Sequence, residues 1–333
     1  MGYDPFLEGV EDKVPMLQIF AVRLREGKIA PKGNPIRART VEDYVRGVAQ
    51  TFAGLGRPDP RLNADHKIDF RLRRLWKAWG KEDPPPHRVK PIPLSVLRRI
   101  ADYAHNGLDD RRKAISDMII LAFFFLLRPG EYTYPGSKSD SSPFRLMDIQ
   151  FFRGTRRINL STCSDTDLRL ANFCTLEFTN QKNGVRGEVI GLTSSGDPLV
   201  CPVRALLRRY QYLVSHEAPQ EAPLATLFDD TAKGVTPKMI TETIRDAVSA
   251  LGPADLGFLP KDVSARCLRA AGANALLLSG VDSDIIRLIG RWRSDEMIRY
   301  LHVQAAPLMA GYSARMVQAS NYRLIPNREV PSH

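Results

Sequence analysis

A proline-rich segment with the sequence KEDPPPHRVKPIP, from Lys81 to Pro93, constrains the fold more than any other feature. Three consecutive prolines cannot continue a helix, and they favour an extended, semi-rigid spacer. The chain has 333 residues, which is enough for two domains of ordinary size. The sequence therefore predicts a first domain over residues 1–82, a linker over 83–93 and a second domain over 94–333.

The charge balance points to a polyanionic partner. The chain has 48 Lys and Arg residues against 37 Asp and Glu residues, which gives a formal net charge of +11. Hydrophobic residues make up 43% of the chain, so it can form a core and does not resemble a disordered basic tail. A folded protein with surplus cationic surface is expected to bind nucleic acid.

Several classes of protein are not favoured. The longest apolar run, Met118 to Leu127, is too short for a membrane helix, and the N-terminus has no signal-peptide pattern. We expect no membrane segment and an intracellular location: the nucleus of a eukaryote, or otherwise the cytoplasm. The scattered cysteines and histidines favour a reducing compartment and predict neither a metal site nor a cofactor. The cysteines are Cys163, Cys174, Cys201 and Cys267.

The first part of the chain is predicted to be helical. Apolar residues recur at helical spacing over 14–26, from residue 40 onward and over 68–79. A solvated helix face is the simpler interpretation of any one basic residue on the third helix. Taken together, they favour a surface that contacts the phosphate backbone of DNA. These residues are Arg71, Arg73, Arg74 and Lys77.

The second part is predicted to be mainly helical with a small antiparallel β-sheet. Strand patterns fall between residues 144 and 192, and Asn183-Gly184 predicts a hairpin turn between the last two strands. Helices are predicted over 94–106, 111–127, 202–214, 237–251, 262–278, 283–289, 295–303 and 307–319. The helix over 111–127 becomes apolar on all sides, so we expect it to be buried.

Four positions invite a chemical interpretation. Arg128 follows the most apolar helix, where a guanidinium is costly without a partner. It forms either a structural salt bridge with Glu131 or an anion site in which Glu131 orients it. Arg266 and Arg269 stand three residues apart on a predicted helix that begins at Asp262. They are expected to hold a phosphate-like group between them, unless one of them extends into solvent.

The other two positions are a lysine and a tyrosine. Lys182 lies beside the predicted hairpin turn, where a lysine is either a solvated surface residue or a mobile charge delivered into a site. Tyr300 follows Trp292 by eight residues and is either a core residue or a nucleophile activated by nearby cations. No nucleotide-binding or serine-hydrolase motif competes with this set.

The order of these residues resembles the tyrosine recombinase (phage integrase) family. The sequence FLLRPGE is followed by a hairpin lysine, then by RxxR, and then by GRW with a later tyrosine. The motif GRWRSD…RYLH most resembles the corresponding motif in recombinases of eukaryotic mobile elements. The resemblance covers the chain beyond the linker. It implies a helical, SAM-like core-binding domain over 1–82 and an α+β catalytic domain over 94–333.

The resemblance assigns a role to each matching residue. Arg128 and Arg269 match the two phosphate-binding arginines, Glu131 matches the supporting acidic residue, and Lys182 matches the general acid. Trp292 matches the position held by His or Trp, and Tyr300 matches the nucleophile. Tyr312 and Tyr322 are poorer matches to the nucleophile. The sequence departs from the family pattern at Arg266, which stands where histidine is usual.

The resemblance also implies a mechanism and partners. Tyr300 would attack a phosphodiester of double-stranded DNA and form a 3′-phosphotyrosyl link, with neither metal nor ATP, in a homo-tetramer on two DNA sites. Arginine remains protonated in proteins, so Arg266 cannot act as a base; we expect it instead to lower the pKa of Tyr300 by its charge. The segment 307–319 either reaches a neighbouring subunit or folds onto its own core.

Three other functions remain open at this level. The chain could be a DNA-binding descendant of a recombinase that no longer cuts, an interpretation that Arg266 slightly favours. It could be a type IB topoisomerase-like enzyme, which shares the catalytic residues. It could also be a basic α+β protein whose arginines are structural.

Overall fold

The computed structural model of the protein describes residues 4, 6–85, 89–136, 142–179 and 187–292. The chain divides into two compact units, residues 1–87 and 88–333, and the division falls inside the predicted linker. The two ends of that linker belong to different units. Asp83 accepts a hydrogen bond from the backbone N–H of Ala38 in the first unit. The backbone N–H of Lys90 donates to the carbonyl of Asp262 in the second.

The first unit contains three helices, α1 (Val14–Arg25), α2 (Ala38–Gly54) and α3 (Phe70–Glu82). Their inward faces form one small core that includes Leu17, Val45 and Leu72. A polar cap fixes the start of α3. Asp69 caps α3 by accepting from the N–H of Arg71 at 2.8 Å, as expected for an aspartate at the start of a helix.

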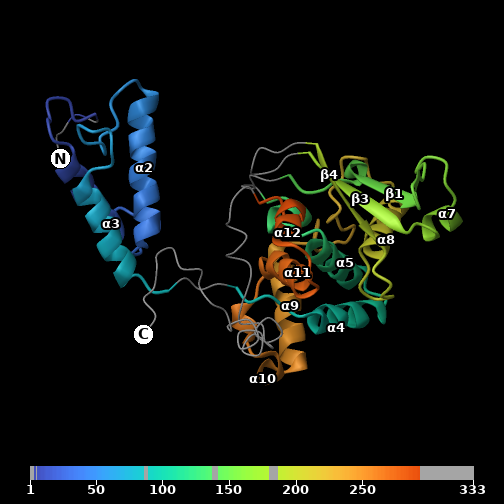
Figure 1. The fold of residues 1–333 in the computed structure, drawn as a ribbon. Coiled ribbons are helices and arrows are strands. Elements are labelled where there is room, and N and C mark those ends of the chain that lie inside the picture. The colour runs from blue at the N-terminus through green and yellow to red at the C-terminus, as the bar shows by residue number, and fades with distance from the viewer. Residues whose placement is uncertain (1–3, 5, 86–88, 137–141, 180–186, 293–333) are drawn as a thin grey trace, which may run out of the picture. The chain divides into compact units, whose positions relative to one another are not determined.

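The helices of the second unit pack around α5 (Asp110–Phe124). Every residue of α5 from Ala114 to Phe123 is buried, which confirms the burial expected from its all-round apolar sequence. Four long helices contact it, besides a short one that follows it directly, and Figure 1 shows the four grouped around it. They are α4 (Leu94–His105), α8 (Pro202–Ser215), α9 (Pro237–Leu251) and α11 (Cys267–Leu278).

A four-stranded antiparallel sheet covers one side of this unit (Figure 1). Its strands are β1 (Ile149–Arg153), β2 (Arg156–Arg157), β3 (Phe173–Phe178) and β4 (Glu188–Thr193), in the order β2-β1-β3-β4. Phe178 pairs with Glu188, so β3 and β4 form the predicted hairpin. The structure confirms a mainly helical fold with a small antiparallel sheet.

Short elements connect the longer ones. They are α6 (Pro129–Tyr132), the 3-10 helix η1 (Leu146–Asp148), α7 (Asp165–Arg169), α10 (Pro253–Leu256), the 3-10 helix η2 (Pro260–Asp262) and α12 (Ser283–Ile289). Of these, only α12 is among the predicted helices. The predicted helices over 295–303 and 307–319 lie outside the described residues.

The structure contradicts the predicted start of one helix. The sequence predicts a helix from Asp262, but Asp262 ends η2, and its carboxylate accepts from the backbone N–H of Leu259 at 2.9 Å. The chain is extended at Val263, and α11 starts only at Cys267. An aspartate at the end of a short turn uses the same capping chemistry as one before a helix, so the two cannot be distinguished from the sequence alone.

Within the described residues, no helix has the length and apolar character needed to cross a membrane. The same residues contain no cluster of three or more His, Cys, Asp or Glu side chains placed to hold a metal ion.

Candidate active site

The sharp corner after α5 places Arg128. The helix ends at Phe124, and Leu126 takes a left-handed backbone conformation with φ of 52°. That conformation costs a leucine about 1–2 kcal/mol, so the surrounding contacts must stabilise it. Arg128 then stands at the N-cap of α6, with Pro129 in the first helical turn. A buried helix followed by a tight turn therefore presents one guanidinium at its end.

Glu131 holds Arg128 in place. One oxygen of its carboxylate accepts from the backbone N–H of Arg128 at 2.8 Å, and the other accepts from Nη1 of the Arg128 guanidinium at 3.1 Å. The Glu131 side chain is 2% exposed, whereas that of Arg128 is 23% exposed. A buried carboxylate thus holds the Arg128 guanidinium, and part of the guanidinium remains open to solvent. Both sequence interpretations of this pair require the contact with Glu131.

Arg269 reaches the same corner from α11. Nη1 of its guanidinium donates to the carbonyl of Leu126 at 2.6 Å, and Nη2 donates to the carbonyl of Gly290. The residue is 3% exposed. The close approach depends on Gly272, because a Cβ at that position would overlap the backbone of Phe123.

Trp292 covers Arg269. The guanidinium carbon of Arg269 lies 4.2 Å from the centroid of the indole ring, at the distance of a cation–π contact. Trp292 is 8% exposed and packs in a small cluster with Leu126 and Ile286. Its ring occupies the space beside Gly290, where any Cβ would overlap it. The structure therefore brings Trp292 together with the corner that carries Arg128.

Arg291 joins Arg128, Glu131, Arg269 and Trp292 as a fifth member of this cluster, and sequence reasoning missed it. Its side chain is 1% exposed and contacts Glu131, with Nη2 to Oε2 at 3.2 Å. Burial lowers the pKa of Arg291 to about 10, so it remains charged at neutral pH. The only sequence signal is its place beside Trp292 in the apolar stretch IGRW, where a charge would need a partner.

The cluster has an excess of positive charge. Arg128 and Arg291 contact Glu131, Arg269 contacts the same corner at the carbonyl of Leu126, and Glu188 on β4 acts on Arg291 at longer range. Three cations and two carboxylates leave one unbalanced positive charge among these five residues. A partly exposed guanidinium above a buried cationic cluster can bind a phosphate through charge-assisted hydrogen bonds.

Arg266 follows the second of the two interpretations offered for this pair, in which one arginine extends into solvent. It is the N-cap of α11 and is exposed, whereas Arg269 is buried. The two therefore do not lie side by side on one packed helix face. Arg269 also directs its two Nη atoms toward backbone carbonyls. The Tyr132 hydroxyl donates to the carbonyl of Ala265 at 2.8 Å and thereby ties α6 to the residue before Arg266.

Two predicted catalytic residues, Lys182 and Tyr300, lie outside the described residues, as do the competing Tyr312 and Tyr322. The described parts of the chain contain the segments that lead to both. β3 ends at Phe178, before the hairpin segment with Lys182, and Trp292 is the last described residue before Tyr300. The roles of these residues stay predictions.

The basic residues predicted on α3 divide into two kinds. Arg71 is paired with two carboxylates: its guanidinium donates to Asp12 at 2.6 and 3.0 Å and to Asp69 at 2.9 and 3.0 Å. Three others are exposed and share one side of the helix, at spacings of three and four residues. They are Arg73, Arg74 and Lys77.

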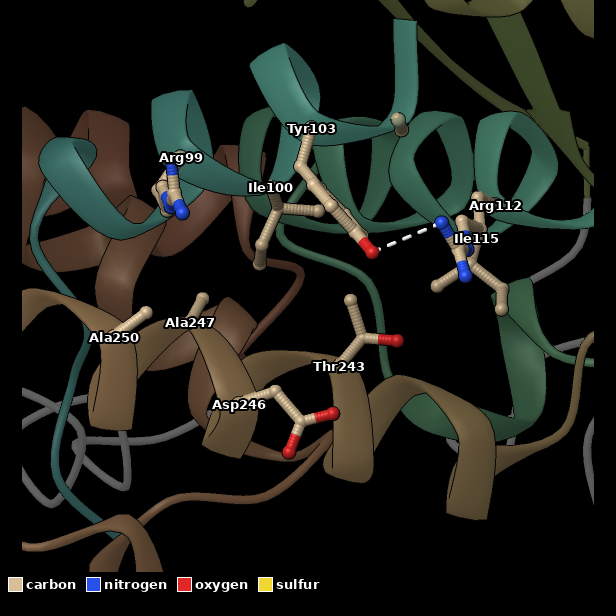
Figure 2. Close-up of a pocket in the computed structure, with 10 residues that line it drawn as sticks. Arg99, Ile100, Tyr103, Arg112, Ile115, Thr243, Asp246, Ala247 and Ala250 are labelled. Atoms are coloured by element: carbon tan, nitrogen blue, oxygen red, sulfur yellow. Dashed lines mark hydrogen bonds between the residues drawn. The ribbon is translucent and has the colours of Figure 1, made fainter. Parts of the chain in front are cut away.

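A cavity of about 330 Å³ lies between α4, α5 and α9 (Figure 2), and none of the predicted catalytic residues within the described parts of the chain lines it. Ile100 of α4 and Ala247 of α9 line it from opposite sides, and Asp246 also lies on α9. On the opposite side, Arg112 donates to the Tyr103 hydroxyl at 2.9 Å.

Solved structures identify the fold. The XerH site-specific recombinase, bound to a palindromic difH substrate in a post-cleavage complex, matches with a TM-score of 0.51 at 12% identity. The match covers 94% of this chain and 74% of that one. The Tn1549 transposon integrase in complex with a circular intermediate DNA matches with a TM-score of 0.51 at 11% identity. That match covers 92% of this chain and 86% of the integrase chain.

No protein-family profile matches the sequence, and no curated protein matches it. The likeness therefore rests on the fold. A helical first unit is followed by a second unit, in which α5, the β3–β4 hairpin, α11 and α12 occur in the order that the resemblance implies. Both matched structures are tyrosine recombinases. The protein has the tyrosine recombinase fold.

Proposed function

We propose that the protein cuts and rejoins double-stranded DNA as a tyrosine recombinase. The observation that carries the proposal is the cluster after α5, in which Arg128 is oriented by buried Glu131 and stands beside Arg269 and Trp292. The matched recombinase and integrase are complexes with DNA, and the net charge of +11 suits the same partner.

The proposed reaction conserves the phosphodiester bond energy. Tyr300 loses its phenolic proton to solvent, its phenolate oxygen attacks the scissile phosphorus, and the bond from phosphorus to the 5′-oxygen breaks. Lys182 gives that oxygen its proton, while Arg128 and Arg269 stabilise the charge that develops on the non-bridging oxygens. The 5′-hydroxyl of a second strand then attacks the phosphotyrosine and releases Tyr300. A homo-tetramer on two DNA sites is part of the proposal.

A suicide substrate tests the proposal. The purified protein is incubated with a library of nicked duplexes whose downstream strand is too short to remain annealed once it is cut. We expect a covalent protein–DNA adduct that survives SDS, because the released 5′-hydroxyl strand diffuses away and cannot reverse the reaction. Tyr300→Phe should abolish the adduct, whereas the control variants Tyr312→Phe and Tyr322→Phe should retain it.

The second candidate is a DNA-binding descendant that no longer cuts. Two observations favour it: Arg266 replaces the usual histidine, and both Nη atoms of Arg269 donate to backbone carbonyls. Salt-sensitive DNA binding without any adduct would support this candidate and contradict the first. A type IB topoisomerase-like enzyme would form the adduct but would relax supercoiled DNA without exchanging strands between two sites.

A further inference from the structure

Arg291 is one of the buried charges of the cluster, and its contacts account for that burial. Nη1 donates to the carbonyls of Phe125 at 3.2 Å and Ile289 at 3.0 Å. Nη2 donates to the carbonyl of Leu126 and to Glu131 Oε2, both at 3.2 Å. Arg291 itself has a left-handed backbone, with φ of 56°. A buried guanidinium is tolerated only where such partners surround it.

These contacts join three segments that are far apart in the sequence. The carbonyls of Phe125 and Leu126 belong to the corner that presents Arg128. The ring of Phe178, at the end of β3, lies 3.9 Å from the guanidinium carbon of Arg291. Arg291 itself follows α12. The chain continues from these three places to Arg128, Lys182 and Tyr300, so one buried side chain links the segments that carry three predicted catalytic residues.

Glu131 connects Arg291 to Arg128. Oε2 accepts from Arg291 and from the backbone N–H of Arg128, while Oε1 accepts from the Arg128 guanidinium. The carboxylate is 2% exposed, so water cannot replace a lost partner freely. Removal of Arg291 would leave Glu131 with one cationic partner instead of two. The Glu131 carboxylate could then rotate more freely. The Arg128 guanidinium, which is 23% exposed, would then lose its fixed direction.

We propose that Arg291 is a positioning residue, which sets the direction of the Arg128 guanidinium through Glu131 without touching DNA. This inference rests on the proposed function. Its contacts define this role: Nη2 of Arg291 donates to the same Glu131 carboxylate that accepts from the backbone and the guanidinium of Arg128, so Arg291 can fix the carboxylate that fixes Arg128.

The first experiment separates cleavage from DNA binding in the full-length protein. The variants are Arg291→Met and the conservative Arg291→Lys, with Arg287→Met on α12 as the control, where the arginine pairs with Asp284 and its side chain is 41% exposed. Adduct formation on the suicide duplexes gives the cleavage rate, and fluorescence anisotropy gives the DNA affinity. We expect Arg291→Met to slow cleavage about 100-fold, the usual loss when one transition-state donor is misplaced. DNA affinity should be unchanged, Arg291→Lys should recover part of the rate, and Arg287→Met should match the wild type.

The second experiment tests the route through Glu131. Arg291→Met is combined with Glu131→Gln, which also removes the unpaired buried carboxylate and so helps the variant to fold. If Arg291 acts through Glu131, the double variant should be about as slow as Glu131→Gln alone. A double variant whose loss is the product of the two single losses would overturn the inference, as would equal losses of rate and DNA affinity in Arg291→Met. Absence of any adduct from the wild type would instead refute the proposed function.

Discussion

Arg266 occupies a position that its own helix does not favour. It is the N-cap of α11, and the amide end of a helix carries partial positive charge, so a cation there gains nothing from the helix. Its side chain is exposed, whereas Arg269, one turn further along, is buried against backbone carbonyls. An exposed cation next to the cluster is open to a phosphate or a phenolate, as the electrostatic hypothesis for Tyr300 requires.

Substitution of Arg266 tests that hypothesis. Arg266→Ala should slow adduct formation about 10- to 100-fold, because a charge that stabilises the phenolate is lost. Arg266→His should retain cleavage at low pH and lose it as the pH rises through the histidine pKa of about 6.5, because only the protonated ring replaces the cation. The measurement is the adduct rate between pH 5.5 and 9. An alanine variant as fast as the wild type across this range would rule the hypothesis out.

Single residues also show where sequence reasoning ends. The pairing of Arg128 with Glu131 could be predicted, because both stand within one turn of a helix end and a guanidinium near an apolar helix needs a carboxylate. The contact between Arg291 and Glu131 joins residues 160 positions apart, and no local pattern encodes it. Charged side chains are almost never fully buried unless they are paired, so the sequence favoured exposure for Arg291.

At the scale of elements, the hairpin and the long helices follow from local sequence, but the approach of α11 to α5 does not. The strand patterns and Asn183-Gly184 predict the β3–β4 hairpin because turn chemistry and alternation agree. The predicted start of α11 at Asp262 is wrong, because Asp262 caps η2 instead. The contact at Gly272 depends on a neighbouring helix, which periodicity within α11 cannot reveal.

Gly272→Ala tests this contact between α11 and α5. The new Cβ would overlap the Phe123 carbonyl and the Leu126 side chain. We expect the second unit to lose about 1–3 kcal/mol of stability through overpacking. The control is Gly47→Ala on the exposed side of α2, where a Cβ meets nothing within 4 Å. There alanine should stabilise the first unit by about 0.5–1 kcal/mol.

Calorimetry of the two full-length glycine variants measures both effects, since each unit has its own core and is expected to give its own transition. Stabilisation of the second unit by Gly272→Ala would contradict the close packing of α11 on α5.

The whole molecule combines two units with a shared surplus of positive charge. The first unit presents Arg73, Arg74 and Lys77 on one side of α3. The cluster in the second unit includes a partly exposed Arg128 above buried cations. Composition could predict the class of partner, since net charge depends on the residues alone. It could not predict that Arg71 is neutralised by Asp12 and Asp69, because Asp12 lies 59 residues away.

Salt dependence distinguishes the two kinds of basic residue on α3. Each phosphate contact that is lost should reduce the slope of log K against log salt concentration by about 0.9. We therefore expect the variant Arg73→Gln/Arg74→Gln/Lys77→Gln to bind DNA with a slope lower by about 2–3. Arg71→Gln should barely change it, because its charge is already balanced. Binding titrations at several salt concentrations provide the slopes, and equal reductions from Arg71 and from each exposed residue would contradict this assignment.

The stacking of Trp292 on Arg269 supplies a built-in fluorophore. The chain has three tryptophans, and the other two, Trp76 and Trp79, lie in contact with each other on α3. A protein that carries phenylalanine at both of those positions would therefore emit from the indole beside the second arginine alone. Its emission spectrum would follow, in real time and without a label, whether that arginine keeps its aromatic cover when a nucleic acid arrives.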